Sequence, residues 1–215
     1  MSIDKIGILG AGRAGTALAR AAASGGIHVT IAGSRPARLM KYHLAQYAPQ
    51  AIAVDAIDIA KDVQLVALMV PQEDLDDIDS ESLAGSLLID ATNRWNDEPL
   101  PHWLQSAIDR GLSSSEALAE HFSQSRMAKA LNHISHWDLD ADRASKSAAR
   151  RALGIAADSP QDAALVASLV CQLGFTPVQL PDLAAGQALE PTGQIFNEVL
   201  GAEEFIRRIG SENQV

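Results

Sequence analysis

The sequence predicts an α/β protein of Rossmann type: a doubly wound parallel sheet with a small C-terminal α/β lobe. Strand-like and helix-like segments alternate through the first half of the chain, as in βαβ units. A G-x-G-x-x-G run follows the first predicted strand, and a later strand is apolar at almost every position, as a strand covered on both faces should be. With 215 residues, the chain can bury a sizeable core without disulfides or metals.

The first half contains five predicted strands. The strand Ile6–Leu9 leads into an alanine-rich helix over Ala14–Ser24, which ends at Gly25 and Gly26. The other four strands are predicted at His28–Ala32, Ala51–Val54, Gln64–Val70 and Ser86–Ile89. Because parallel strands need crossover connections, this alternation indicates right-handed βαβ units.

The second half is less regular. Its predicted elements are a helix over Ser114–His121, a strand over Met127–Ala130, a polar connection over Asn132–Arg150, a strand–helix–strand unit over Ala152–Ala156, Gln161–Leu173 and Thr176–Gln179, and a last helix after a tail with glycines and prolines. The pattern leaves open whether the late strands extend the first sheet or form a separate lobe. We predict a dinucleotide-binding domain over 1–131 and a small lobe over 132–215 that completes a cleft.

The strongest motif is the glycine loop after the first strand. In a dinucleotide site Gly10 makes the tight turn, Gly12 lets a pyrophosphate approach the backbone, and Gly15 lets the helix pack closely on the strand. The helix N-terminus adds unpaired N–H groups and a partial positive charge. The alternative is a glycine turn that only packs helix on strand. The predicted pyrophosphate loop comprises Gly10, Gly12, Arg13, Ala14 and Gly15.

The end of the second strand indicates which nucleotide binds. An NAD site places an Asp or Glu about 20 residues after the glycine motif, where it binds the ribose 2′-hydroxyl. Here that register holds Ser34 and Arg35, with Arg38 one helical turn further on. Two guanidinium groups can bind a 2′-phosphate through charge-assisted hydrogen bonds. The sequence therefore predicts NADP(H), although two solvated arginines at a helix start would show the same pattern.

Two further strand ends are expected at the same edge of the sheet, because ligands of such sheets bind at the carboxyl ends of the strands. Val70 and Pro71 end the fourth strand, where they can pack against the nucleotide. Small and hydrogen-bonding residues follow the fifth strand, namely Ala91, Thr92 and Asn93. The alternative is that these residues only satisfy their own loop backbone.

Composition and charge exclude several classes of protein. Lysine and arginine number 17 against 27 acidic residues, so the net charge of −10 argues against nucleic-acid binding. The single cysteine, Cys171, excludes an internal disulfide and favours a reducing cytoplasm; its apolar surroundings predict burial. No targeting segment and no membrane span is expected. The spacing of His133, His136 and Asp138 suggests a metal site, but a further ligand is missing, so none is predicted.

The runs GILGAGRAG, AGSRPAR, ALMVP, DATNRW, SSSEALAEHF, KALNHI and LEPTGQIF follow one another along nearly the whole chain. In this order they resemble the NADP oxidoreductases that depend on the deazaflavin coenzyme F420, and in particular the short bacterial, deazaflavin-reductase-like members. KALNHI and the late segment LGF…LAAGQALEP are the more specific motifs. The resemblance is poorest over Asp138–Arg150.

This resemblance implies hydride transfer between nicotinamide C4 of NADPH and C5 of a deazaflavin, in a cleft between the Rossmann domain and the lobe. It implies that Ser34, Arg35 and Arg38 bind the 2′-phosphate and that Val70 and Pro71 lie beside the nicotinamide. The two residues it places in the hydride-transfer cleft are Asn132 and His133. His133 is expected either to serve the acceptor as a hydrogen-bond or proton donor, or to be structural. No side-chain nucleophile is needed, because the cofactors carry the chemistry.

Three functions remain open at this stage. The first is NADP(H)-dependent reduction of a deazaflavin, the second is reduction of a free flavin or chelated metal, and the third is a non-catalytic NADP(H) sensor. All three bind the nucleotide, so the glycine loop does not separate them. The expected partners are small molecules and a second copy of the chain, with Phe196, Val199, Leu200 and Phe205 as candidate dimer residues.

Overall fold

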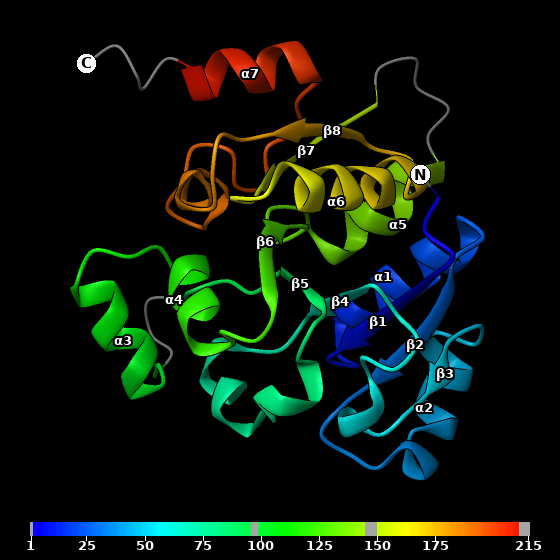
Figure 1. The fold of residues 1–215 in the computed structure, drawn as a ribbon. Coiled ribbons are helices and arrows are strands. Elements are labelled where there is room, and N and C mark those ends of the chain that lie inside the picture. Colours follow the sequence, from blue (N-terminus) through cyan, green and yellow to red (C-terminus); the bar gives the residue numbers. More distant parts are fainter. Residues whose placement is uncertain (1, 96–98, 145–149, 211–215) are drawn as a thin grey trace.

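The computed structural model describes residues 2–95, 99–144 and 150–210. Its centre is an eight-stranded sheet with the order β3-β2-β1-β4-β5-β6-β7-β8 (Figure 1). The strands are β1 (Lys5–Leu9), β2 (His28–Ala32), β3 (Ile52–Ala53), β4 (Leu65–Leu68), β5 (Leu87–Asp90), β6 (Arg126–Ala130), β7 (Ala152–Ala156) and β8 (Thr176–Gln179). Neighbouring strands are parallel except for β6 and β7, which are antiparallel.

The first six strands confirm the predicted fold class. Their order, 3-2-1-4-5-6, is that of the doubly wound dinucleotide-binding fold. The structure also answers the question that the sequence left open: β7 and β8 extend the same sheet beyond β6. Leu153 and Ile155 of β7 even share one apolar cluster with Ile6 and Ile8 of β1. The division of the chain at residue 131 stays a prediction.

Helices cover both faces of the sheet. They are α1 (Arg13–Ser24), α2 (Lys41–Tyr47), α3 (His102–Asp109), α4 (Ser114–His121), α5 (His136–Ala144), α6 (Pro160–Gln172) and α7 (Ala202–Gly210). Short 3-10 helices fill several connections: η1 (Ala37–Leu39), η2 (Ala56–Asp58), η3 (Gln72–Asp77), η4 (Ser80–Leu83) and η5 (Ala184–Leu189). None of the helices in the described part of the chain has the length and hydrophobicity that crossing a bilayer requires.

Strand β4 shows why its sequence is apolar throughout. Leu65 and Ala67 belong to the apolar cluster that also contains residues of α1 and α6. Val66 and Leu68 belong to the cluster on the opposite face, together with residues of α3 and α4. Both faces of the strand are therefore buried, as the continuous apolar run predicts.

Two local predictions were wrong. The expected polar connection over Asn132–Arg150 contains helix α5, which packs against α1; residues 145–149 of the connection lie outside the described residues. Among residues 136–140 of α5, whose burial the structure describes, Leu139 is the buried one, so this part of the sequence shows little helical periodicity. Cys171 is exposed, because α6 turns Val170 and Leu173 toward the core and leaves the thiol outside.

Candidate functional site

The predicted site residues gather at the carboxyl edge of the sheet. Backbone hydrogen bonds continue past the strand ends: Gly10 N–H donates to Ala32 O at 2.8 Å, and Met69 N–H donates to Leu9 O at 2.7 Å. Strands β5 and β6 follow β4 in parallel register. The loops after β1, β2, β4, β5 and β6 therefore line one edge, where ligands of such sheets bind.

The three motif glycines meet different surroundings. Gly10 has φ +119°, and a Cβ there would lie 2.3 Å from the Met69 carbonyl oxygen. A Cβ on Gly15 would lie 1.8 Å from the Gly10 carbonyl oxygen, so only glycine allows α1 to approach the loop. A Cβ on Gly12 would have no atom within 4 Å. The backbone is thus open at Gly12, where a pyrophosphate needs room.

The N-terminus of α1 is suited to an anion. Its N-cap residue, Gly12, makes no side-chain capping bond, and the first turn contains no acidic residue. Helix N–H groups without a capping side chain are the usual partners of a bound phosphate. The loop and helix therefore fit the pyrophosphate of a dinucleotide.

A pocket of about 290 Å³ adjoins the glycine loop at the end of β2. Its lining residues are Ala11, Gly12, Gly33, Ser34, Arg35, Leu39, Met40 and His43. A hydroxyl and a guanidinium therefore share one pocket with the glycine loop, and this lining contains no carboxylate. Arg38 lies exposed on η1 and is not part of the lining.

His43 in this pocket was missed by the sequence analysis. Its Nε2 lies 2.7 Å from the Ala11 carbonyl oxygen, so the nitrogen that faces the loop donates to it. His43 stands on α2, well past the nucleotide motifs, and no spacing rule singles it out. Only the packing of α2 beside the loop brings it into the pocket.

The residues after β4 and β5 differ in accessibility. Val70 is half-buried and Pro71 is exposed at the end of β4. Thr92 is buried, and its backbone N–H and hydroxyl both donate to Asp90 Oδ1, at 2.9 and 2.7 Å. Its two neighbours, Ala91 and Asn93, are half-buried and remain closer to the surface of the edge.

Asn93 connects the ends of β5 and β6. Its Nδ2 donates to the Asn132 carbonyl oxygen at 2.9 Å, and Asn132 Nδ2 donates back to Asn93 Oδ1 at 3.1 Å. Asn132 Nδ2 also donates to the Leu189 carbonyl oxygen at 2.6 Å. The residue before it, Leu131, has a φ of +65°, a left-handed conformation that costs a non-glycine residue roughly 1–2 kcal/mol.

His133 has the surroundings of a structural histidine. It is 1% exposed, and its Nε2 accepts a hydrogen bond from Gly154 N–H at 3.0 Å, so Nδ1 carries the proton and faces Asn132 Oδ1 at 3.3 Å. Burial, followed by the charges of Arg151 and Lys129, lowers the pKa of His133 to about 3. Of the two roles considered, the geometry favours support of Asn132 over proton transfer.

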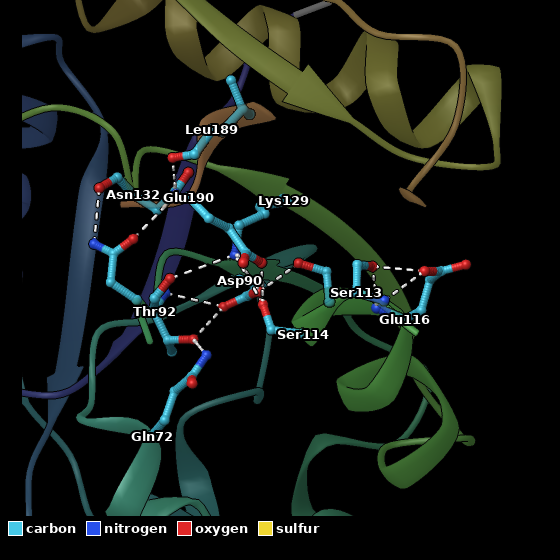
Figure 2. A network of polar contacts seen from close by, with 12 residues as sticks. Gln72, Asp90, Thr92, Ser113, Ser114, Glu116, Lys129, Asn132, Leu189 and Glu190 are labelled. Atoms are coloured by element: carbon cyan, nitrogen blue, oxygen red, sulfur yellow. Dashed lines mark hydrogen bonds and ion pairs between the residues drawn. The ribbon is translucent and has the colours of Figure 1, made fainter. Parts of the chain in front are cut away.

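A buried polar network lies behind these asparagines (Figure 2). Lys129 on β6 is fully buried; its Nζ lies 2.9 Å from Asp90 Oδ2 on β5 and 3.5 Å from Glu190 Oε1. Ser115 donates to Asp90, and Ser114 donates to Glu190. The network therefore joins β5, β6, α4 and the segment after η5.

Asp90 remains ionised in this network. Burial by itself would raise the pKa of Asp90, but the charge of Lys129 and hydrogen bonds from Ser115, Thr92 and Lys129 outweigh burial and lower it. The sequence analysis missed the network. The available signal was a lysine inside the apolar run Met127–Leu131, which a solvated strand would not explain.

Gln72 completes the network on the side of β4. The hydroxyl proton of Thr92 goes to Asp90, so Gln72 must present its Nε2 to Thr92 Oγ1, at 2.9 Å. The other amide atom, Gln72 Oε1, is buried without a hydrogen-bond partner. The site thus retains one unsatisfied acceptor next to Pro71.

Comparison with known proteins agrees with this geometry. A family model described as "NADP oxidoreductase coenzyme F420-dependent" matches residues 5–94. The chain is similar to the hypothetical protein SMa0349 from Sinorhizobium meliloti, with a TM-score of 0.78 and 26% identity over 94% of this chain and 96% of that one. A search of curated proteins finds no significant match.

Two further solved structures share the fold. A provisionally named F420-dependent NADP reductase from Arthrobacter sp. FB24 has a TM-score of 0.66 and 19% identity, covering 99% of this chain and 96% of that one. The 3-hydroxyisobutyrate dehydrogenase of Mycobacterium tuberculosis has a TM-score of 0.58 and 16% identity, covering 87% of this chain and 57% of that one. Residues 5–94, which include the glycine loop, Ser34 and Arg35, match the family of coenzyme F420-dependent NADP oxidoreductases, and this match supports an NADP-dependent oxidoreductase.

Proposed function

We propose that the protein transfers hydride between NADP(H) and a deazaflavin of the coenzyme F420 type. The main evidence for NADP(H) binding is the pocket in which Ser34 and Arg35 lie beside the open backbone of Gly12. A lining without a carboxylate suits a 2′-phosphate and disfavours the ribose hydroxyl pair of NAD. The choice of a deazaflavin as hydride acceptor is supported by the description of the family model and by the late sequence motifs.

In this proposal each strand end has one task. The loop Gly10, Gly12, Arg13, Ala14 and Gly15 binds the pyrophosphate; Ser34 and Arg35, with Arg38 from η1, bind the 2′-phosphate. Val70, Pro71 and Ala91 pack beside the nicotinamide, with Thr92 and Asn93 behind it. When bound, NADPH supplies a hydride from its nicotinamide C4. Asn132 lines the acceptor side of the cleft, and His133 supports it through the Nδ1–H contact.

Stopped-flow mixing of the protein with NADPH and an oxidised deazaflavin tests the proposal. Matched, rapid loss of NADPH and deazaflavin absorbance is expected, because direct transfer consumes both together. Tight NADPH binding without transfer to the deazaflavin would overturn the acceptor. The same NADPH-loaded sample is then mixed with free flavin and with chelated ferric iron, the alternative acceptors. No transfer to any of them indicates a nucleotide sensor.

The proposal also includes a cytoplasmic homodimer. Two apolar residues near the C-terminal helix are well exposed, Val199 at 69% and Ile206 at 59%. Of the four candidates named from the sequence, Val199 is thus exposed and Phe196 is half-buried, whereas Leu200 and Phe205 are buried within the chain and are not available for a dimer contact. Light scattering at micromolar concentration tests the dimer; a monomeric mass would exclude it.

A further inference from the structure

The buried network ends in a residue that does not line the nucleotide pocket and is partly exposed. Glu190 follows η5, and its side chain is 15% exposed, against 0% for Lys129 and Asp90. One of its oxygens, Oε1, faces both Lys129 Nζ, at 3.5 Å, and the hydroxyl of Ser114. The carboxylate thereby connects the segment after η5 to β6 and to the start of α4.

The residue before Glu190 contacts Asn132, which the proposed function places on the acceptor side of the cleft. The Leu189 carbonyl oxygen accepts a hydrogen bond from Asn132 Nδ2, so the position of residues 189 and 190 sets the orientation of the Asn132 amide (Figure 2). A second tie lies nearby, because Asn197 N–H donates to the His133 carbonyl oxygen at 3.0 Å. The C-terminal segment thus determines how the loop after β6 is presented.

The loop after β6 requires such support. Leu131 occupies the left-handed region with φ +65°, and a strained residue of this kind persists only where neighbouring contacts hold it. Gly186 of η5 lies against Lys129, since a Cβ there would be 3.0 Å from Lys129 Cδ. The segment therefore contacts Lys129 in two ways: η5 packs against its side chain, and Glu190 pairs with its ammonium group.

We propose that Glu190 is a positioning residue: its ion pair with Lys129 holds the Leu189 carbonyl in place, and this carbonyl orients Asn132 toward Asn93. The inference rests on the proposed function only in assuming that Asn132 faces the hydride acceptor. Its physical content, the coupling of Glu190 to the Asn132 amide, does not depend on the identity of the acceptor.

The variant Glu190→Gln tests this coupling. It keeps the shape of the side chain, and Lys129 keeps its pair with Asp90, so no buried charge loses every partner. The primary measurement is hydrogen exchange of the Asn132 side-chain amide, followed by NMR on the protein without nucleotide. We expect exchange at least fivefold faster in Glu190→Gln, and partial recovery in Glu190→Asp, which restores the charge at a longer distance.

A matched control is available on the same segment. Glu198 pairs with Arg208 at 3.1 Å at a partly exposed site, and Glu198→Gln should leave Asn132 exchange unchanged. NADPH affinity should stay within twofold in both variants, because the nucleotide pocket lies at the other end of the edge. Where hydride transfer is observed, its rate should fall about tenfold in Glu190→Gln, with KM for NADPH unchanged.

The outcomes separate this inference from the proposed function. Asn132 exchange that is equal in Glu190→Gln and the unaltered protein overturns the positioning role, whatever the acceptor proves to be. Absence of transfer to a deazaflavin overturns the proposed acceptor and leaves the exchange result valid. If Glu190→Gln does not fold, Glu190→Asp, which lengthens the distance between the carboxylate and Lys129 Nζ, is judged by the same exchange criterion.

Discussion

Two ends of the carboxyl edge of the sheet are built in opposite ways: the end with the glycine loop, Ser34 and Arg35 (the nucleotide end), and the end with the buried pair Asp90 and Lys129 (the network end). At the nucleotide end, open backbone at Gly12 and the exposed side chains of Ser34 and Arg35 surround a pocket. At the network end, Asp90 and Lys129 are fully buried and satisfied by one another and by hydroxyl groups. One end leaves its polar groups accessible around a pocket, and the other pairs them with one another inside the protein.

This difference predicts how the two ends respond to mutation. Exposed groups that await a ligand contribute little to folding, so their loss should reduce binding alone. Buried charges leave an unpaired partner when one is removed, so their loss should reduce the free energy of unfolding. The four predictions below test this separation, from the largest expected effect to the smallest.

Lys129→Met should have the largest effect. It leaves the Asp90 carboxylate buried without its counter-ion, which typically costs about 3–5 kcal/mol in the free energy of unfolding. Urea denaturation measures the loss. Lys61→Met, which removes an exposed ion pair with Asp58, is the control and should cost less than about 1 kcal/mol. A loss of that small size in Lys129→Met would mean that the network does not stabilise the fold.

Acidification should weaken the network end through His133. The folded pKa of about 3 lies below the ordinary value of 6.5, so the unfolded chain binds more protons between these values. The contribution of His133 to the free energy of unfolding is therefore fully present above pH 6.5. It falls by up to about 1.4 kcal/mol per pH unit as the pH decreases toward 3. The lowered pKa of Asp90 extends the loss to lower pH, since its contribution is present above the ordinary 3.8 and disappears as the pH falls through the folded value.

Urea denaturation between pH 7 and pH 4.5 measures this slope. His133→Gln should flatten it, because the titrating group is removed. His102, which is exposed on α3, provides the control variant His102→Gln, and the slope should persist there. An unchanged slope in His133→Gln would assign the acid sensitivity to other groups.

Arg35→Ala should act on binding alone. If its guanidinium binds the 2′-phosphate, NADPH affinity falls by about 1.5–3 kcal/mol, roughly 10- to 150-fold, while NADH affinity changes little. The free energy of unfolding should not change, because Arg35 is exposed. Calorimetric titration with both nucleotides is the measurement, and Arg207→Ala on α7 is the control. Equal losses for NADPH and NADH would exclude Arg35 from the 2′-phosphate site.

The glycine loop allows folding and binding to be separated within one motif. Gly15→Ala places a Cβ 1.8 Å from a backbone oxygen and should cost about 1–3 kcal/mol in the free energy of unfolding. Gly12→Ala meets no neighbouring atom and should change that free energy by less than about 0.5 kcal/mol, yet weaken NADPH binding. Full NADPH affinity in Gly12→Ala would show that the pyrophosphate does not approach this residue.

The nucleotide end was the more predictable half of the candidate site. The positive φ of Gly10 and the contact between Gly15 and the Gly10 carbonyl lie within six residues, so the motif spacing alone indicates the turn and the close packing, whereas the contact of Gly10 with Met69 comes from β4. Ser34 and Arg35 follow at a distance that one βαβ unit sets. His43 was not predictable, because it enters the pocket only through the packing of α2.

The network end depends on contacts between residues far apart in the chain. Asp90, Lys129 and Glu190 come from β5, β6 and the segment after η5, and nothing in their local sequence indicates that they meet. A lysine inside an apolar strand signals a buried partner but does not identify it. Since a buried charge is stable only when it is paired, the partner is chosen by the arrangement of the strands.

The sequence by itself determined the Rossmann-type α/β fold, the glycine loop and the preference for NADP(H), because each depends on residues close together in the chain. Tertiary structure alone decided that β7 and β8 extend the main sheet, that Cys171 faces outward and that α5 replaces a polar connection. It also decided that Glu190 reaches Lys129. These features depend on which distant surfaces are buried against each other, and a local pattern of residues does not contain that information.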